Sequence, residues 1–129
     1  RKAGLTSLHM PALGGLRKAR KDSINNGWRN ASFRGYADFM QTEEFQRALE
    51  ELMVYGTDMK TAIMCAEAVP WRCHRSLIAD ALVARGWEVR HILSQVEANE
   101  HRLTPFAVID GDILVYPQPA YPLDLPRLF

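Results

Sequence analysis

Cysteine is scarce in this sequence, and long apolar runs are absent. Only two of the 129 residues are cysteine, so nothing indicates a disulfide-stapled extracellular scaffold, and a reducing, cytoplasmic location is expected. No apolar stretch approaches the length of a membrane span, and the opening "RKAGLTSLHM" lacks the layout of a signal peptide. With 47% hydrophobic and 24% charged residues, the chain is expected to form one soluble domain without membrane contact.

The formal net charge of +1 conceals an uneven distribution of charge along the chain. Residues 1–35 carry eight basic residues and one acidic residue, whereas residues 36–70 carry two basic and seven acidic residues. The basic end is concentrated in "RKARKDS" (17–23) and "WRNASFR" (28–34). Such a block can meet the phosphates of a small molecule or a nucleic acid, or it can be a solvated loop. The sequence leaves both interpretations open.

Capping residues and apolar spacing predict two helices. Thr42 is a favourable N-cap, and apolar residues at helical spacing follow it, so an amphipathic helix is expected to run to a stop at Gly56. A second helix is expected from about Cys73 to a stop at Gly86. The predicted buried positions are Phe45, Ala48, Leu49, Leu52 and Met53 in the first helix and Leu77, Ile78, Ala81 and Leu82 in the second.

Short apolar runs predict strands on either side of the second helix. Residues 60–65 and 87–93 are expected to be strands, and strand–helix–strand in this order indicates a βαβ unit with a parallel sheet. An earlier strand is expected over residues 5–10, followed by a long loop over 11–35. "FAVIDGDILVYP" (106–117) predicts a hairpin that turns at Asp110-Gly111.

The predicted fold is therefore α/β, a Rossmann-like three-layer arrangement with a short, mostly parallel sheet and a C-terminal β-hairpin. Residues 1–117 would form this single domain. Residues 118–129 would form a tail, because their prolines prevent a central strand or a helix.

The stretch "MCAEAVPWRCHRS" (64–76) concentrates the candidate site residues. Ligands of open α/β sheets bind at the carboxyl ends of strands, where Cys65 is expected. The following helix start favours an anion through its free N–H groups, and arginine adds a bidentate fork for phosphate. Cys73 there would have a lowered pKa and could act as a nucleophile, with Glu67 as an acid–base group. The candidate catalytic residues are Cys65, Glu67, Cys73 and His74, and the candidate anion-binding residues are Arg72, Arg75 and Ser76.

Other interpretations of the same residues stay open. A strand-end Cys65 followed by a loop and an arginine is similar to rhodanese-type sulfurtransferases and to cysteine phosphatases. However, the loop is not glycine-rich, and Arg72 lies one residue too far from Cys65 for the phosphatase spacing. The cysteines could also be structural, in a non-enzymatic module that binds a protein partner. A zinc site from Cys65, Cys73, His74 and His91 or His101 matches no known ligand spacing, so neither a metal nor a cofactor is expected.

Four segments together resemble the bacterial family called domain of unknown function 488. They are "LGG" with a following arginine (13–17), "GWRNASFRGYADFMQTEEF" (27–45), "CAEAVPWRCHRSLIADAL" (65–82) and "HRLTPFA" (101–107). The resemblance implies a Rossmann-like α/β domain without an established activity. It also implies motif positions at Gly14, Gly15, Cys65, Glu67, Cys73, His74 and Arg75, where the two glycines would allow close backbone approach to an anion. Gly14, Gly15 and the following Arg17 are further candidate anion-binding residues.

The same resemblance predicts what this sequence lacks. Family members begin with strands that carry "T-I-G-H-S" and "D-x-R", and neither motif occurs here. The chain is therefore expected to correspond to the family pattern without its N-terminal strand–helix–strand part. An exposed apolar sheet edge would follow, so the chain is expected to be unstable alone or to form a homodimer. The preferred function is binding or processing of a phosphate-bearing compound.

Overall fold

The computed structural model describes residues 8–14, 17–64, 74–92, 97–111 and 113–118. These residues form a mixed α/β structure with three α-helices, one short 3-10 helix and two small antiparallel hairpins. The helices are η1 (Pro11–Leu13), α1 (Ala31–Phe39), α2 (Glu43–Asp58) and α3 (Arg75–Ala84). The strands are β1 (Arg90–Ile92), β2 (Ala98–Glu100), β3 (Val108–Asp110) and β4 (Ile113–Val115).

The N-termini of α1 and α2 are capped by side chains. The Asn30 side chain accepts hydrogen bonds from the backbone N–H groups of Ser32 and Phe33, at 2.8 and 3.2 Å. The Thr42 hydroxyl accepts a hydrogen bond from the Phe45 N–H at 3.2 Å, as the sequence predicts for α2. The predicted inner positions of α2 are buried, except that Met53 is only partly buried.

The predicted stop of α2 at Gly56 is wrong, because the helix continues to Asp58. A Cβ atom at Gly56 would lie 2.9 Å from the ring of Trp87. The glycine therefore provides room for a tryptophan that packs against the helix, and its absence of a side chain does not end the helix here.

α3 ends at Ala84, and Gly86 follows its C-cap as the stop that the sequence predicts. The N–H of Gly86 donates to the carbonyl of Val83, and the N–H of Trp87 donates to the carbonyl of Leu82. These two bonds form a Schellman motif, in which Gly86 adopts a positive φ of 89°. The four predicted inner residues of α3 are buried.

The predicted parallel βαβ unit is not found among the described residues. β1 pairs with β2 and β3 pairs with β4, and both pairs are antiparallel. The strand expected over 87–93 is reduced to Arg90–Ile92. The hairpin expected over 106–117 is confirmed as β3 and β4, with Gly111 at a φ of 63° in the turn.

Two other predicted strands are wrong where the structure describes them. Residues 60–64 are irregular, and Met64 is 88% exposed. Backbone N–H and C=O groups need a neighbouring strand to form a ladder, and none lies beside this segment in the described part of the chain. Residues 8–10 are also irregular, and Pro11 opens η1.

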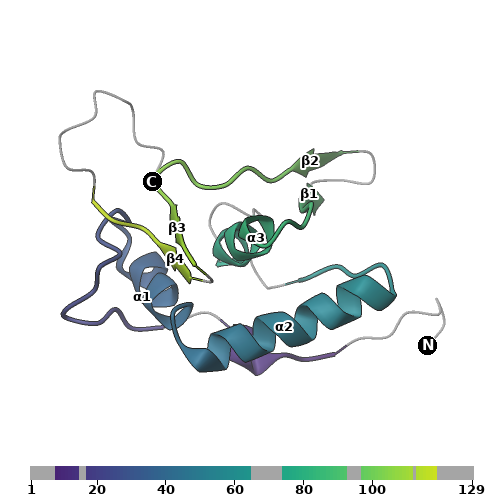
Figure 1. Ribbon diagram of the computed structural model, residues 1–129, viewed down its shortest axis with the longest axis horizontal. Helices are drawn as coiled ribbons and strands as arrows, with labels where there is room; N and C mark the ends of the chain where they lie inside the picture. The colour runs from purple at the N-terminus through teal and green to yellow at the C-terminus, as the bar shows by residue number, and fades with distance from the viewer. Residues whose placement is uncertain (1–7, 15–16, 65–73, 93–96, 112, 119–129) are drawn as a thin grey trace.

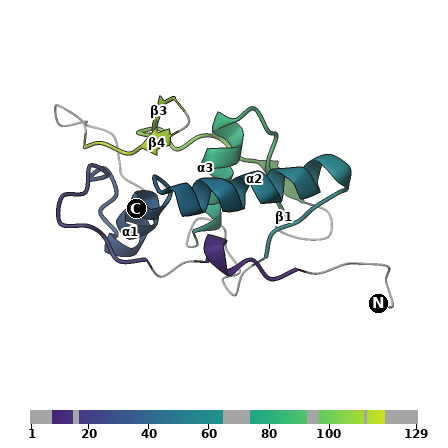
Figure 2. The ribbon, with the colours of Figure 1, turned by 60° about the horizontal axis from the view of Figure 1, so that its bottom comes forward.

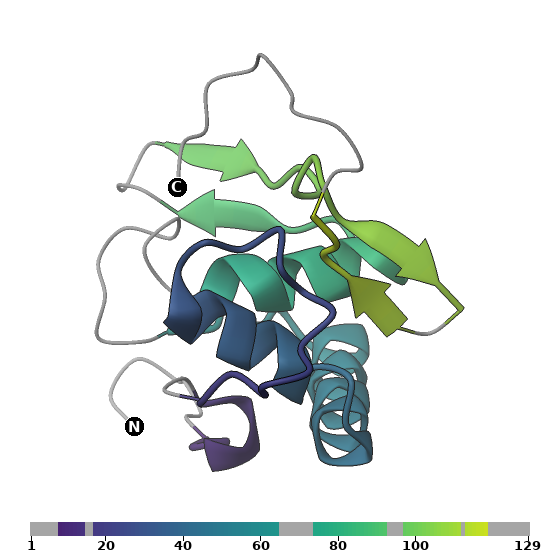
Figure 3. The same ribbon diagram turned by 90° about the vertical axis from the view of Figure 1, so that its left-hand side faces the viewer.

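α3 lies between α2 and the β1–β2 hairpin, as two perpendicular views show (Figures 1 and 3). η1 lies against α2 (Figure 2), and α1 lies beside α3 (Figure 3). The core fills the space between these elements, and Trp28 joins its parts. The ring of Trp28 packs edge-on against Phe33 and Phe106, at centroid distances of 5.1 and 5.0 Å. Among the helices described, none has the length and apolar character required to cross a bilayer.

Candidate functional site

Half of the site residues that the sequence predicts lie outside the described residues. These are Gly15, Cys65, Glu67, Arg72 and Cys73. The catalytic roles predicted for the cysteines and for Glu67 therefore stay predictions. The residues that the structure does describe are Gly14, Arg17, His74, Arg75 and Ser76.

The last three of these residues lie at the start of α3. His74 occupies the N-cap position, and Arg75 and Ser76 begin the ten-residue helix. The His74 ring packs on the Tyr36 ring with a centroid distance of 5.0 Å. Burial, and secondly the positive charge of Arg75, lower the pKa of His74 below its usual value. His74 is therefore neutral near pH 7, and Arg75 is the cationic group at this helix start.

Arg75 also lines a cleft of about 270 Å³ between the C-terminal half of α2, residues 59–63, α3 and residues 87–92. We call it the basic cleft, because Lys60, Arg75 and Arg90 line it together with a single acid, Glu88. The remaining walls are formed mainly by apolar groups and include Trp87 and His91. An anion that enters this cleft meets an excess of positive charge on a largely apolar surface.

Gly14 and Arg17 do not line the basic cleft. The N–H of Gly14 donates to the carbonyl of Pro11 at 3.0 Å, which closes η1. The Arg17 guanidinium lies 3.7 Å above the centre of the Phe39 ring, and its Nε donates to the Gly14 carbonyl at 3.3 Å. The described contacts of these two residues join the loop to helix α1, and the structure does not bring them into one site with Arg75.

A group of polar residues that the sequence did not single out as a site surrounds Asp80, which is buried in the middle of α3. The Asp80 carboxylate accepts hydrogen bonds from the Thr104 hydroxyl at 2.6 Å and from the Tyr116 hydroxyl at 2.8 Å. The Thr104 N–H donates to it at 3.0 Å. The Nε2 atom of His101 lies 2.7 Å from Asp80 Oδ1. The signals in the sequence are a lone acid within the apolar run "LIADAL" and His101, which is considered there only as a zinc ligand.

The hairpin register extends this group to a second histidine. β1 pairs with β2 so that His91 faces Asn99, and the N–H of His101 donates to the Val89 carbonyl at 2.7 Å. His91 and His101 are therefore diagonal neighbours on one face of the hairpin. Their rings meet edge-on, and His91 Nε2 lies 2.7 Å from His101 Nδ1. Burial, and then the charges of His101 and Arg75, lower the pKa of His91, against a smaller opposing effect of Asp80.

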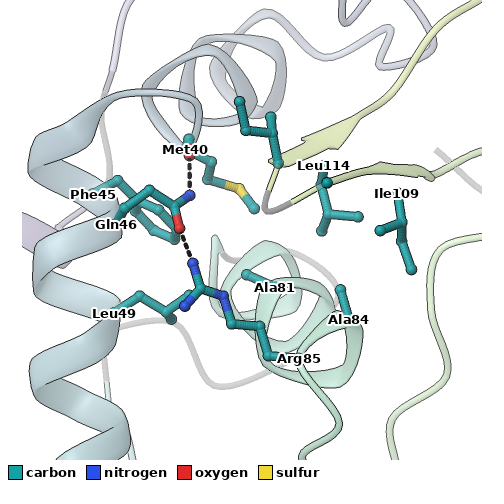
Figure 4. Close-up of a pocket in the computed structure, with 11 residues that line it drawn as sticks. Met40, Phe45, Gln46, Leu49, Ala81, Ala84, Arg85, Ile109 and Leu114 are labelled. Carbon is teal, nitrogen blue, oxygen red and sulfur yellow. Dashed lines mark hydrogen bonds between the residues drawn. The ribbon is translucent and has the colours of Figure 1, made fainter.

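A second cavity, also of about 270 Å³, lies between α2, α3 and the β3–β4 hairpin (Figure 4). Its walls are mainly apolar, with side chains such as Phe45, Leu49 and Leu114 pointing toward it. Its one cationic group, Arg85, donates to Gln46, which in turn donates to the Met40 carbonyl at 2.9 Å. Because this cavity has one cationic group and the basic cleft has three, the cavity is the less favourable place for an anion.

No group of three or more metal-ligating side chains occurs within the ranges that the structure describes. Asp80, His101 and His91 follow one another in a chain and do not converge on a point. Each ring nitrogen between them is used in a hydrogen bond to the next member.

Comparisons with known proteins support the family resemblance. Neither the curated proteins nor the solved structures contain a significant match to this chain. The family described as "Domain of unknown function DUF488" matches residues 1–82, which include η1, α1, α2 and most of α3. Because this match covers more than half of the 129 residues, the chain belongs to the DUF488 family.

Proposed function

We propose that this chain binds a phosphate-bearing compound, of the nucleotide or nucleic-acid class, in the basic cleft. The proposal depends on the location of Arg75, which belongs both to a helix start and to the wall of the cleft. It begins a ten-residue helix, and it lines a cleft whose charged groups are three cations and one acid. The helix dipole and the guanidinium fork both favour an anion at this end of the cleft.

The three cations of the basic cleft contribute unequally. Arg90 is exposed and forms an ion pair with Glu88, with Nε 2.6 Å from a carboxylate oxygen. The positive charge of Arg90 is thus largely compensated within the protein. Lys60 has no such ion pair among the described residues. Lys60, together with Arg75 at the start of α3, is assigned to the phosphate in this proposal.

The presence of Trp87 favours a ligand that carries an aromatic ring in addition to its phosphate. It lines the basic cleft and packs next to Gly56 of α2. Nucleobases stack on tryptophan with a typical contribution of about 1–3 kcal/mol per base. A nucleotide could therefore place its phosphate toward Arg75 while its base lies on the apolar part of the wall.

Ligand-dependent thermal stabilisation tests this function. We expect inorganic phosphate and a nucleoside monophosphate to raise the midpoint of unfolding, with the nucleotide acting at lower concentration. A ligand present at 100 times its dissociation constant stabilises the folded state by about 2.7 kcal/mol. Added salt should weaken the effect of an oligonucleotide more than that of the mononucleotide.

Matched variants test whether the stabilisation by phosphate comes from binding in the basic cleft. Arg75→Gln and Lys60→Gln should each reduce the stabilisation by phosphate. Arg47→Gln provides the control, since Arg47 forms an exposed i,i+4 ion pair with Glu43 on α2 and does not line the basic cleft. Equal stabilisation of all three variants and of the unmodified chain would show that phosphate does not bind in this cleft.

A further inference from the structure

The hydrogen-bond partners of Asp80 indicate the charge state of its side chain. Its two oxygens lie within 3.0 Å of four groups, namely the Thr104 N–H, the Thr104 hydroxyl, the Tyr116 hydroxyl and His101 Nε2. An ionised carboxylate has about four acceptor positions, so these partners fill it completely. A protonated carboxyl group would place a hydrogen where one of these donors already points. Asp80 is therefore a buried carboxylate, and His101 Nε2 is a donor to it.

For a neutral His101 ring, the direction of every hydrogen bond in the chain follows from this point. With its proton on Nε2, a neutral His101 presents a lone pair on Nδ1. His91 Nε2 lies 2.7 Å from that atom, so it carries a proton and donates it. A neutral His91 then has its lone pair on Nδ1. The arrangement fixes both tautomers and leaves a basic nitrogen at the end of the chain.

This terminal nitrogen belongs to a residue of the basic cleft. His91 lines the cleft together with Arg75, and the charge of Arg75 lowers the pKa of His91. His91 Nδ1 forms no hydrogen bond with any residue in the described ranges. Arg75 and the imidazole of His91 thus line the same cleft.

We propose that Asp80, His101 and His91 form a hydrogen-bonded relay that orients the His91 ring, and that His91 is the general base for hydrolysis of a phosphate ester bound in the basic cleft. The proposal rests on the proposed function, since the ester must bind there. His91 Nδ1 takes a proton from a water molecule as the water oxygen forms a bond to phosphorus. The bond from phosphorus to the alcohol oxygen breaks, and its electron pair passes to that oxygen. The alkoxide takes a proton from solvent, and the imidazolium releases its proton to solvent.

Asp80 and His101 act as positioning residues in this scheme. When His91 gains a proton it becomes a cation, and His101 connects it to the buried negative charge of Asp80. That charge favours the protonated state that forms during the reaction, whereas burial and Arg75 keep His91 neutral beforehand. The relay therefore holds His91 in the tautomer that a general base requires.

Hydrolysis of 4-nitrophenyl phosphate and bis(4-nitrophenyl) phosphate by the full chain tests the catalytic role. We expect His91→Gln to reduce kcat by about 100-fold or more, which is the usual contribution of a general base. His9→Gln is the control, because His9 is exposed and does not line the cleft. The kcat of the unmodified chain should rise with pH through the titration of His91, which faces His101, Asp80 and Arg75. An absence of hydrolysis, or equal hydrolysis by His91→Gln, would overturn the relay.

Nitrogen-15 NMR of the imidazole rings tests the relay without any substrate. We expect both His91 and His101 to carry their proton on Nε2 at pH 7.5, and His101→Gln to remove this preference in His91. A proton on His91 Nδ1 would contradict the proposed direction of the chain. This readout is insensitive to a purely structural loss of stability, provided that the variant is folded in the same spectra.

Phosphate binding separates failure of the relay from failure of the proposed function. If inorganic phosphate stabilises the chain through Arg75 but neither ester is hydrolysed, the cleft binds phosphate and the relay is overturned. If phosphate has no effect and no ester is hydrolysed, both proposals are overturned. Hydrolysis that depends on His91 supports both.

Discussion

The hydroxyl of Tyr116 donates a hydrogen bond of 2.8 Å to the carboxylate of Asp80, and both side chains are fully buried. The bond joins the middle of α3 to the residue that follows β4. Burial, and then the negative charge and the hydrogen bond of Asp80, raise the pKa of Tyr116 well above its usual value. Tyr116 therefore stays protonated and remains a donor at any physiological pH.

Replacement of Asp80 should destabilise the fold. Asp80→Asn removes a charge that four donors surround and turns one acceptor into a donor, which we expect to cost about 3 kcal/mol of unfolding free energy. Urea denaturation at pH 7 measures this change. Asp110→Asn, at an exposed position on β3, should change the free energy by less than about 0.5 kcal/mol. A similar effect of both substitutions would refute the assigned role of Asp80.

Asp38 provides a second prediction, about the loop that contains Arg20, Ser23 and Asn25. Its carboxylate accepts hydrogen bonds from the Arg20 N–H, the Ser23 hydroxyl and the Asn25 amide, at 2.8, 2.6 and 2.7 Å. Asp38→Ala should release this loop, because it removes three bonds to one carboxylate. We expect trypsin to cleave after Arg20 at least about tenfold faster, equivalent to about 1.4 kcal/mol of local opening.

Limited proteolysis followed by mass spectrometry measures that cleavage. Asp58→Ala is the control, since Asp58 is an exposed carboxylate at the end of α2. Cleavage after Arg20 should be unchanged in the control variant. If Asp38→Ala also leaves the rate unchanged, the loop does not depend on the Asp38 hydrogen bonds.

The sequence predicted the local features of this fold well. The Thr42 cap, the apolar faces of α2 and α3 and the Gly86 stop all depend on residues a few positions apart. The β3–β4 turn is equally local, since Asp110 and Gly111 adjoin each other in the hairpin. Such features can be read from spacing because the interacting groups lie within one or two turns of the chain.

The features that the sequence missed depend on distant partners. His101, Thr104 and Tyr116 lie 21, 24 and 36 positions from Asp80, and no spacing rule joins them. The predicted strand is absent over residues 60–64 for a related reason, because apolar composition alone cannot supply a partner strand. Gly56 was interpreted as a helix stop because its contact with Trp87 is invisible in the sequence.

Gly35 gives a prediction that opposes helix propensity. It lies inside α1, where alanine is normally more favourable than glycine by about 1 kcal/mol. However, a Cβ atom at this position would lie 2.0 Å from the backbone oxygen of Arg17. We therefore expect Gly35→Ala to destabilise the fold by about 2–4 kcal/mol, measured by urea denaturation. Ser32→Ala, at an exposed position of the same helix, should be nearly neutral; a stabilising Gly35→Ala would show that the loop does not pack there.

The lowered pKa values of two histidines predict how the stability of the fold depends on pH. His74 and His91 both have a pKa below the usual 6.5 in the folded chain. Between the folded and unfolded values the unfolded chain binds more protons, so acidification favours unfolding. This contribution to stability is fully present above pH 6.5 and is lost as the pH falls through the folded values.

Urea midpoints between pH 5 and 8 measure this dependence. We expect His74→Gln and His91→Gln each to flatten the decrease in stability below pH 6.5. His9→Gln, at an exposed position, should keep the full decrease. The assignment is wrong if the control flattens the curve as much as the two buried-histidine variants do.

Exposed apolar groups near the basic cleft lead to a prediction about self-association. Met64 is 88% exposed and Ile92 is 69% exposed. β1 pairs with β2 on one edge, and its other edge has no strand partner in the described ranges. An open strand edge next to apolar side chains favours pairing with a second copy of the chain.

Size-exclusion chromatography with light scattering over a range of concentrations tests this pairing. We expect a species with twice the mass of the chain to increase with concentration, and Ile92→Lys to shift the equilibrium toward the monomer. A lysine at an edge strand opposes pairing because its charge would be desolvated in the interface. Val54→Lys is the control, since Val54 is 59% exposed, belongs to α2 and does not line the basic cleft. A monomer at all concentrations, or an equal response of both variants, would show that the β1 edge does not mediate association.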